Sequence, residues 1–325
     1  MDQQSRQARR EQRRREIRRR RRGAVAGLLA VAICAAVVVV VVANQGGPPA
    51  GANSDRQSSV YASTAKPTRA RRSSSTVPTN ARTGPPGHQA VPILMYHVIA
   101  APPAGAPFPG LYVPPAEFAE QMQALEQAGW HAVTLDQVQA YWTRGVSLGA
   151  GKPIVVSFDN GYQSQYTQAL PVLRRLGWVG DENLQLTGLP PSQGGLGQDE
   201  IRGLLAAGWE LDTQGISHAD LITLDARQLH EQVAVARQTI QRRFHVPVNW
   251  FCYPSGHYNP TVVAAVAAAG FTGSTTVMPG WAHPTDDRYR LHRLRVLGGT
   301  TAAGLLSLLT DTREDGPAPE SYGAA

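Results

Sequence analysis

Polar side chains that could act as acids, bases or metal ligands follow apolar runs at four places in the chain. The first place holds His97 and the second holds Asp159 and Asn160. The third holds Asp212, Gln214 and His218, and the fourth holds Ser255 and His257. If the apolar runs are parallel strands with helices outside, the polar groups at their carboxyl ends meet at one edge of the sheet. Histidines and a carboxylate that converge there could bind a divalent metal and polarise a carbonyl group.

The segments between residues 91 and 309 alternate between strand-like and helix-like patterns. Apolar, β-branched runs predict strands at 91–99, 132–135, 153–159, 182–188, 209–215, 249–256, 271–277 and 289–296. Apolar residues at helical spacing predict helices at 114–130, 136–144, 164–177, 198–209, 225–244, 259–270 and 300–309. Pro171 predicts a kink or break in its helix. This alternation indicates an α/β fold with parallel strands and outer helices.

Four motifs resemble, in order and spacing, those of the polysaccharide deacetylase family (NodB-homology, carbohydrate esterase family 4). They are MYHVI (95–99), SFDNGYQSQY (157–166), GWELDTQGISHADL (208–221) and FCYPSGHYN (251–259). The MYH motif is similar to the branch of that family which deacetylates poly-N-acetylglucosamine. The resemblance covers about residues 90–300. It implies a distorted (β/α) barrel of the NodB-homology type and metal-assisted hydrolysis of N-acetyl groups on a polysaccharide.

The resemblance also implies roles for individual residues. Asp159 takes the position of the general base, His97 that of the general acid, and Arg293 that of the arginine which orients the base. Ser255 occupies the position whose backbone N–H stabilises the oxyanion. Tyr162, directly after the D-N-G turn, is the aromatic residue best placed to contact a sugar ring.

The metal positions implied by the resemblance depart from the family pattern. They fall on Asn160, Gln214 and His218, so amides replace two of the three ligands. Neutral amide oxygens suit calcium or magnesium better than zinc, so we expect a zinc-like divalent metal to bind weakly, or not at all if the site is inactive. An alternative is that Asp212 and His257 join His218 to rebuild the site.

Each of these residues also has a structural interpretation. Asp159 could cap the next helix, Asn160 with Gly161 is a common turn pair, and His97 could be a buried histidine. His218 could stabilise its own loop, and Gln214 could be a neutral hydrogen-bonding filler. Four tryptophans could include a sugar-stacking platform, but most of them close helix–strand junctions and are expected in the core. They are Trp130, Trp209, Trp250 and Trp281.

The N-terminal region differs from the rest in charge and hydropathy. Residues 1–22 hold 11 of the 31 Lys and Arg residues and 3 of the 24 acids, a net charge of +8, and the remaining residues carry −1. Residues 23–43 hold no charge and are long enough for a transmembrane helix. A cleaved signal peptide is the alternative. We expect a single-pass cell-membrane anchor with a cytoplasmic N-terminus, an extracytoplasmic main domain and no nucleic-acid partner.

The remaining segments complete the expected organisation. Residues 44–89 are rich in Pro, Gly, Ser and Thr and predict a disordered linker, 90–310 form the deacetylase-like domain, and 311–325 form a disordered tail. Two functions remain open. One is a membrane-anchored hydrolase acting on C–N bonds of cell-wall or exopolysaccharide glycans. The other is a catalytically inactive NodB-like domain that binds glycan or a partner protein.

Overall fold

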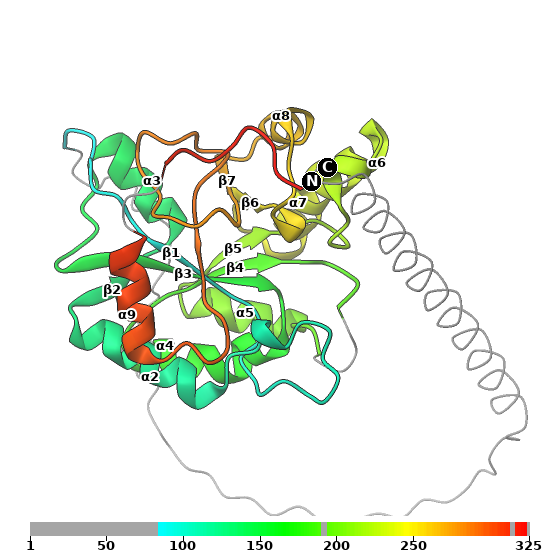
Figure 1. The fold of residues 1–325 in the computed structure, drawn as a ribbon. Coiled ribbons are helices and arrows are strands. Elements are labelled where there is room, and N and C mark those ends of the chain that lie inside the picture. The colour runs from blue at the N-terminus through cyan, green and yellow to red at the C-terminus, as the bar shows by residue number, and fades with distance from the viewer. Residues whose placement is uncertain (1–83, 190–193, 313–315, 324–325) are drawn as a thin grey trace, which may run out of the picture. The chain divides into compact units, whose positions relative to one another are not determined.

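The computed structural model describes residues 84–189, 194–312 and 316–323 (Figure 1). The expected basic segment, the transmembrane helix over 23–43 and most of the linker lie outside these described residues. Within the described ranges, no helix combines the length and the hydropathy that a membrane crossing requires.

A parallel sheet of eight strands forms the centre of the domain, in the order β7-β6-β5-β4-β3-β1-β8, with β2 paired to β3. The strands are β1 Ile93–Tyr96, β2 Trp130–Ala132, β3 Lys152–Asn160, β4 Asp181–Leu184, β5 Glu210–Thr213, β6 Trp250–Cys252, β7 Gly273–Thr275 and β8 Leu294–Arg295. Strand pairing is therefore parallel throughout this sheet, which confirms the expected α/β architecture.

One segment of the chain pairs with both edges of this sheet. Leu291 forms a parallel bridge with Thr275 at the end of β7. Three residues later, Leu294 in β8 pairs with Leu94 in β1. The sheet is thus curled into a half-barrel whose two edges are linked by residues 291–295.

Helices follow most of the strands and cover the sheet (Figure 1). They are α2 Pro115–Gln127, α3 Leu135–Arg144, α4 Leu170–Arg175, α5 Gln198–Ala206, α6 Ala226–His230, α7 Ala236–Phe244, α8 Pro260–Ala268 and α9 Ala302–Asp311. The expected break near Pro171 takes the form of a π-helical turn, Gln165–Ala169, directly before α4. A second π-helical turn, Glu231–Val235, joins α6 to α7.

Side-chain alternation along β3 separates the core from the site. Phe158 points to the helix side, where its ring lies 4.9 Å from Trp209 and 5.8 Å from Tyr96, measured between centroids. Ser157 and Asp159 alternate with Phe158 and therefore point to the other, inner side of the curled sheet. The outer face thus supplies hydrophobic packing while the inner face is free to carry polar groups.

Part of the C-terminal segment has defined contacts. Tyr322 pairs with Tyr258 through two backbone hydrogen bonds of 3.0 and 2.9 Å. The Tyr258 hydroxyl donates to the carbonyl oxygen of Pro319 at 2.8 Å. Residues 316–323, which fall in the segment expected to be disordered, therefore lie against the start of α8.

Candidate active site

A cavity of about 580 Å³ opens at the carboxyl ends of the strands. Its lining includes most of the residues singled out in the sequence, namely His97, Asp159, Asn160, Tyr162, Gln214, His218 and Ser255. These come from the ends of β1, β3, β5 and β6, so the expected convergence of strand ends occurs. A volume of this size is typical of small-molecule and sugar sites.

Asp159 and Arg293 form the most deeply buried polar pair at the cavity. The guanidinium donates to both carboxylate oxygens, with Nη1–Oδ1 at 2.7 Å and Nη2–Oδ2 at 2.9 Å. Burial by itself raises the pKa of Asp159, but the Arg293 charge and its hydrogen bonds outweigh burial and lower the pKa to about 2. Asp159 is therefore a fixed anion near neutral pH, with the arginine partner that the resemblance implied.

His97 lies next to this pair. Its Nε2 is 3.9 Å from Oδ2 of Asp159, and its Nδ1 is buried without a hydrogen-bond partner among the described residues. Burial lowers the pKa of His97 to about 4, against the opposing effect of the Asp159 charge. The imidazole is therefore neutral near pH 7. Gln165 fixes the two strand ends, because its Nε2 donates to the carbonyl oxygens of both His97 and Asp159, at 2.9 and 2.8 Å.

Two further residues position Asp159 and were missed in the sequence. Asn183 donates from Nδ2 to Oδ1 of Asp159 at 3.0 Å, from the paired position on β4. Cys252 on β6 accepts from Arg293 at 3.1 Å and lies 3.6 Å from Oδ2 of Asp159. Strand register could have indicated Asn183 once β3 and β4 were paired. Cys252 carried no such signal, because a cysteine in an apolar strand is ordinarily a core residue.

Two of the expected metal positions, 160 and 214, hold side-chain amides. One of these amides has a hydrogen-bond partner at the cavity, and the other has a carbonyl oxygen without one in the described part of the chain. Asn160 donates from Nδ2 to Oε1 of Gln185 at 2.9 Å. The Oε1 atom of Gln214 is buried and has no hydrogen-bond partner among the described residues. With His218, this set offers two neutral amides and one imidazole. It lacks the anionic ligands that hold zinc, so these three residues do not fit a zinc centre.

Backbone geometry supports the interpretation of Asn160 as a turn residue. Asn160 and Gly161 have φ values of 82° and 85°, in the left-handed region. Among non-glycine residues, Asn and Asp adopt this conformation most readily. The turn therefore explains why a short Asx side chain stands at position 160, and either an amide or a carboxylate satisfies it.

The alternative ligand set of Asp212, His218 and His257 is not assembled. Oδ1 of Asp212 accepts the backbone N–H groups of Asn249 and Trp250, at 3.2 and 2.9 Å. His257 lies with Nδ1 3.1 Å from Oδ1 of Asp220, and neither Asp212 nor His257 lines the cavity. Asp212 is on the inner face, as expected from strand alternation. It lies two residues before Gln214 in the chain, away from the cavity, and its carboxylate is hydrogen-bonded to the backbone of the neighbouring strand β6.

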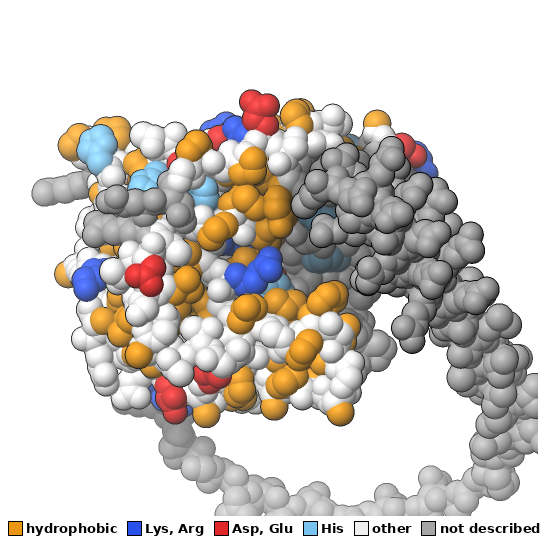
Figure 2. All heavy atoms as spheres, in the orientation of Figure 1, with side chains coloured by type: hydrophobic (Ala, Val, Ile, Leu, Met, Phe, Trp, Pro, Cys, Tyr) orange, Lys and Arg blue, Asp and Glu red, His pale blue; other side chains and the backbone are white. Residues whose placement is uncertain are grey.

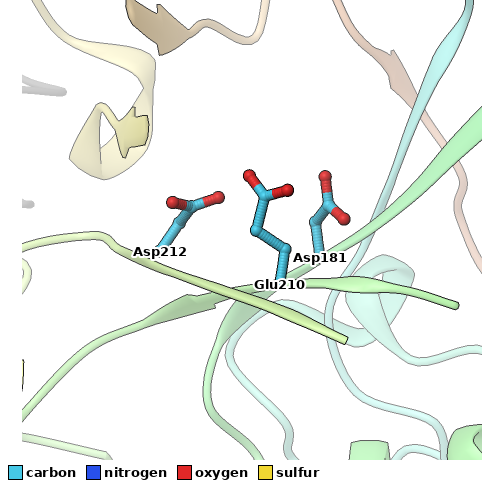
Figure 3. Close-up of side chains that lie close together, drawn as sticks. All are labelled: Asp181, Glu210 and Asp212. Atoms are coloured by element: carbon cyan, nitrogen blue, oxygen red, sulfur yellow. The ribbon is translucent and has the colours of Figure 1, made fainter. Parts of the chain in front are cut away.

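Asp212 instead belongs to a buried acidic group with Asp181 and Glu210 (Figure 3). Across the described ranges, these are the only three His, Cys, Asp or Glu residues with ligand atoms all within 4.8 Å of one another. Asp181 and Glu210 accept the first backbone N–H groups of α3, from Leu135 at 2.9 Å and Asp136 at 3.0 Å. Burial, followed by repulsion between the carboxylates, raises the pKa of all three. The group therefore anchors the start of α3.

Ser255 lies at the cavity in a tight turn after β6. Its φ is 55°, and the next residue, Gly256, has φ 74°. A Cβ atom at position 256 would collide with Val277, so only glycine fits there. The turn thus places Ser255 at the cavity, at the position where the resemblance implies an oxyanion donor.

Aromatic residues divide between the cavity and the core. Tyr162 lines the cavity, as expected. The four tryptophans do not line it, and Trp209, Trp250 and Trp281 are buried. Core packing is therefore their role.

The comparisons agree with this geometry. Residues 149–274 match the polysaccharide deacetylase family. The predicted polysaccharide deacetylase YxkH of Bacillus subtilis (strain 168) is 27% identical over 213 residues, covering 66% of this chain and 74% of that protein.

Solved structures share the fold. The deacetylase PplD of Streptococcus pyogenes, in complex with acetate, aligns with a TM-score of 0.63 and 23% identity over 70% of this chain and 100% of its own. The predicted polysaccharide deacetylase BA0330 of Bacillus anthracis aligns with a TM-score of 0.59 and 26% identity, over 68% of this chain and 69% of its own.

Proposed function

We propose that this chain, which carries a polysaccharide deacetylase domain, hydrolyses the C–N bond of N-acetyl groups on hexosamine units of a polysaccharide. The observation that carries the proposal is the buried pair of Asp159 and Arg293 with His97 beside it, at a cavity of about 580 Å³. A fixed anion next to a neutral imidazole is a suitable arrangement for general acid–base catalysis.

The proposed chemistry follows from the charge states of these side chains. The resemblance gave the role of general base to Asp159, but Arg293 holds both oxygens of that carboxylate, so we assign the base role to His97. Neutral His97 can take a proton from the attacking water and pass it to the leaving amine, while ionised Asp159 stabilises the imidazolium formed in between. Arg293 keeps Asp159 ionised and oriented. The backbone N–H of Ser255 is the candidate donor to the oxyanion. We assign no step to a metal, because the donor set of Asn160, Gln214 and His218 does not fit zinc.

A second candidate function rests on that same donor set. With amides at positions 160 and 214, the domain could bind N-acetylated glycan without hydrolysing it, and so localise the protein on a polysaccharide. The cavity serves this function equally well. Acetate release therefore decides between the two candidates.

The decisive measurement is acetate release from N-acetylglucosamine oligosaccharides by the full chain in detergent. It is run after treatment with a chelator, and again with zinc or calcium added. Release that is lost in His97→Ala supports the hydrolase. Oligosaccharide binding without release under every metal condition supports the binding function.

A double variant tests whether the ligand positions explain any weak metal binding. Asn160→Asp with Gln214→His restores one carboxylate and one imidazole beside His218. We expect it to bind zinc at least tenfold more tightly than the wild type, measured by calorimetry. Equal affinities would show that these positions do not form a metal site.

We also propose that residues 23–43 anchor the protein in the cell membrane with the N-terminus in the cytoplasm. The support is the uncharged 21-residue run directly after 11 arginines. Carbonate extraction of membranes tests the anchor, and protease protection of an N-terminal tag tests the orientation. Release of the chain by carbonate would overturn the proposal.

A further inference from the structure

Two arginines lie two residues apart on the segment that links the sheet edges, and they have different environments. Leu294 and Val296 are buried in the outer hydrophobic core. Arg293 and Arg295 alternate with them and therefore share the inner side. Arg293 is 1% exposed and is paired with Asp159, whereas Arg295 is exposed and lines the cavity. The segment thus places one guanidinium deep in the site and a second one nearer its mouth.

The outer guanidinium has no compensating charge among the described residues. In this part of the chain, no side-chain hydrogen bond or ion pair joins Arg295 to a neighbour. Among the described residues that line the cavity, Asp159 is the one carboxylate, and Arg293 already binds both of its oxygens. The cavity therefore carries an excess positive charge, although the chain beyond residue 22 has a net charge of −1.

Apolar side chains line the same cavity as this charge. Phe108 and Leu111 line the same cavity, and Phe108 is 67% exposed. Figure 2 shows Lys or Arg atoms among hydrophobic side chains near the centre of the drawn face. Apolar neighbours lower the local dielectric constant and so strengthen the attraction of an unpaired cation for an anion.

We propose that Arg295 binds an anionic oxygen group, a carboxylate or a phosphate, on the sugar unit next to the one being deacetylated, so that the preferred glycan is acidic. This inference rests on the proposed function of the cavity and names the substrate class. A guanidinium suits either anion, because its planar donors match two oxygens at once. Arg295 is thus a residue that determines substrate preference, whereas His97 and Asp159 are the residues proposed to carry out catalysis.

Binding measurements with matched oligosaccharides test this inference separately from catalysis. The full chain in detergent is titrated by calorimetry with three probes of equal length. One is neutral N-acetylglucosamine oligosaccharide, one alternates N-acetylglucosamine with glucuronic acid, and one is N-acetylglucosamine oligosaccharide carrying 6-phosphate. We expect at least one acidic probe to bind tenfold or more tightly than the neutral probe, and which one identifies the anion.

Three variants locate the preference. Arg295→Gln should bring the acidic and neutral affinities together, and Arg295→Lys should keep part of the preference because it keeps the charge. Arg175→Gln, on the exposed surface of α4, is the matched control and should keep the full preference. Circular dichroism verifies that each variant is folded. Equal affinities in the wild type, no binding of any probe, or a preference that survives in Arg295→Gln would each overturn the inference.

The outcomes also separate this inference from the proposed hydrolysis. Tight, Arg295-dependent binding of an acidic probe without acetate release supports the inference and contradicts the hydrolase. Acetate release with equal affinity for neutral and acidic probes supports the hydrolase and contradicts the inference.

Discussion

The pair of Asp159 and Arg293 is the residue-scale feature with the largest expected effect on stability. Asp159→Asn leaves the Arg293 guanidinium buried with no anion to offset its charge. Removing one partner of a buried ion pair costs about 3–5 kcal/mol. We therefore expect the free energy of unfolding to fall by roughly that amount, measured by urea denaturation at pH 7. A loss below about 1 kcal/mol would show that solvent already compensates the guanidinium.

His97 has a pKa of about 4, and this predicts an unusual pH dependence of activity. An imidazole that accepts a proton is active while neutral, so acetate release should stay constant from pH 7 down to pH 5 and fall near pH 4. A histidine with its ordinary pKa would lose activity near pH 6.5. The kcat/KM profile of acetate release measures this limb. A midpoint at pH 6 to 7 would contradict the proposed neutral state.

The same pKa values predict how stability changes with acid. The folded pKa of His97 is below the unfolded value, so the unfolded chain binds the proton first and stability falls as pH decreases from about 6.5 to 4. The folded pKa of Asp159, about 2, is also below its unfolded value, and its contribution is lost as pH falls from about 4 to 2. In urea denaturation, His97→Gln should make the first decrease smaller and keep the second. Part of the first decrease should remain, because burial also lowers the pKa of His218. A first decrease of unchanged size in His97→Gln would contradict the assignment.

Sequence patterns predicted which residues lie at the site better than they predicted the hydrogen-bond partners of those residues. His97, Asp159 and Gln214 were placed at one end of the sheet because each follows an apolar run at the carboxyl end of a predicted parallel strand, and strand alternation placed Asp212 on the same face as Gln214. It did not predict that Asp212 is engaged by the N–H groups of the neighbouring strand, because a pattern contains no information on competing donors. Cys252 was missed for a similar reason, since its contact with Arg293 depends on how β6 and β8 approach each other.

At the scale of elements, the acidic group of Asp181, Glu210 and Asp212 connects two strands to the start of α3. Its negative charge is favourable at the N-terminus of α3, because the helix dipole is positive there. Burying three carboxyl groups away from water is unfavourable in free energy. Their folded pKa values are raised, so above pH 4 the unfolded chain releases protons that the folded chain retains. The contribution of these three carboxyl groups to stability is therefore expected to fall as pH rises.

This cost predicts that Asp212→Asn stabilises the domain at high pH. The amide oxygen still accepts the N–H groups of Asn249 and Trp250, and the amide can donate to Glu210. The substitution removes one of the carboxyl groups whose pKa is raised by burial, so we expect a higher melting temperature than the wild type at pH 8 and little change at pH 4. Asp199→Asn, on the exposed start of α5, is the control. A lower melting temperature of Asp212→Asn than of the wild type at pH 8, with a larger difference when calcium is added, would contradict this prediction. It would indicate that a cation binds to the three carboxylates of the wild type.

Local patterns also explain which elements were expected correctly. Helices α5 and α8 begin at Gln198 and Pro260, within one residue of the starts at 198 and 259 that apolar spacing predicted. The π-helical turns before Pro171 and Ala236 were not expected. Each inserts one residue into a helix, and this alters the spacing of the apolar residues too little to be recognised in the sequence. The first of them carries Gln165, which fixes the backbone of His97 and Asp159, so an irregular turn contributes directly to the site.

At the scale of the whole domain, closure of the half-barrel depends on contacts distant in sequence. Residues 291–295 pair with β7 and β1, and the same segment supplies both arginines of the site. The sequence predicted a strand over 289–296 but not its two partners, because pairing order is not encoded in the apolar pattern of one strand. The curled sheet thus brings Arg293 to Asp159, 134 positions apart.

The C-terminal segment adds a last long-range contact, and its removal is a direct test. A chain ending at residue 315 loses both backbone hydrogen bonds between Tyr322 and Tyr258, and leaves the Tyr258 hydroxyl without Pro319. Because Tyr258 is buried in the core around α8, an unsatisfied hydroxyl there costs about 1–3 kcal/mol. We expect urea denaturation to show a loss of that size and hydrogen exchange to show a faster Tyr258 N–H. Tyr322→Ala keeps the backbone pairs and should cost less than about 1 kcal/mol. If the truncated chain unfolds at the same urea concentration as the full chain, the segment contributes nothing to the fold.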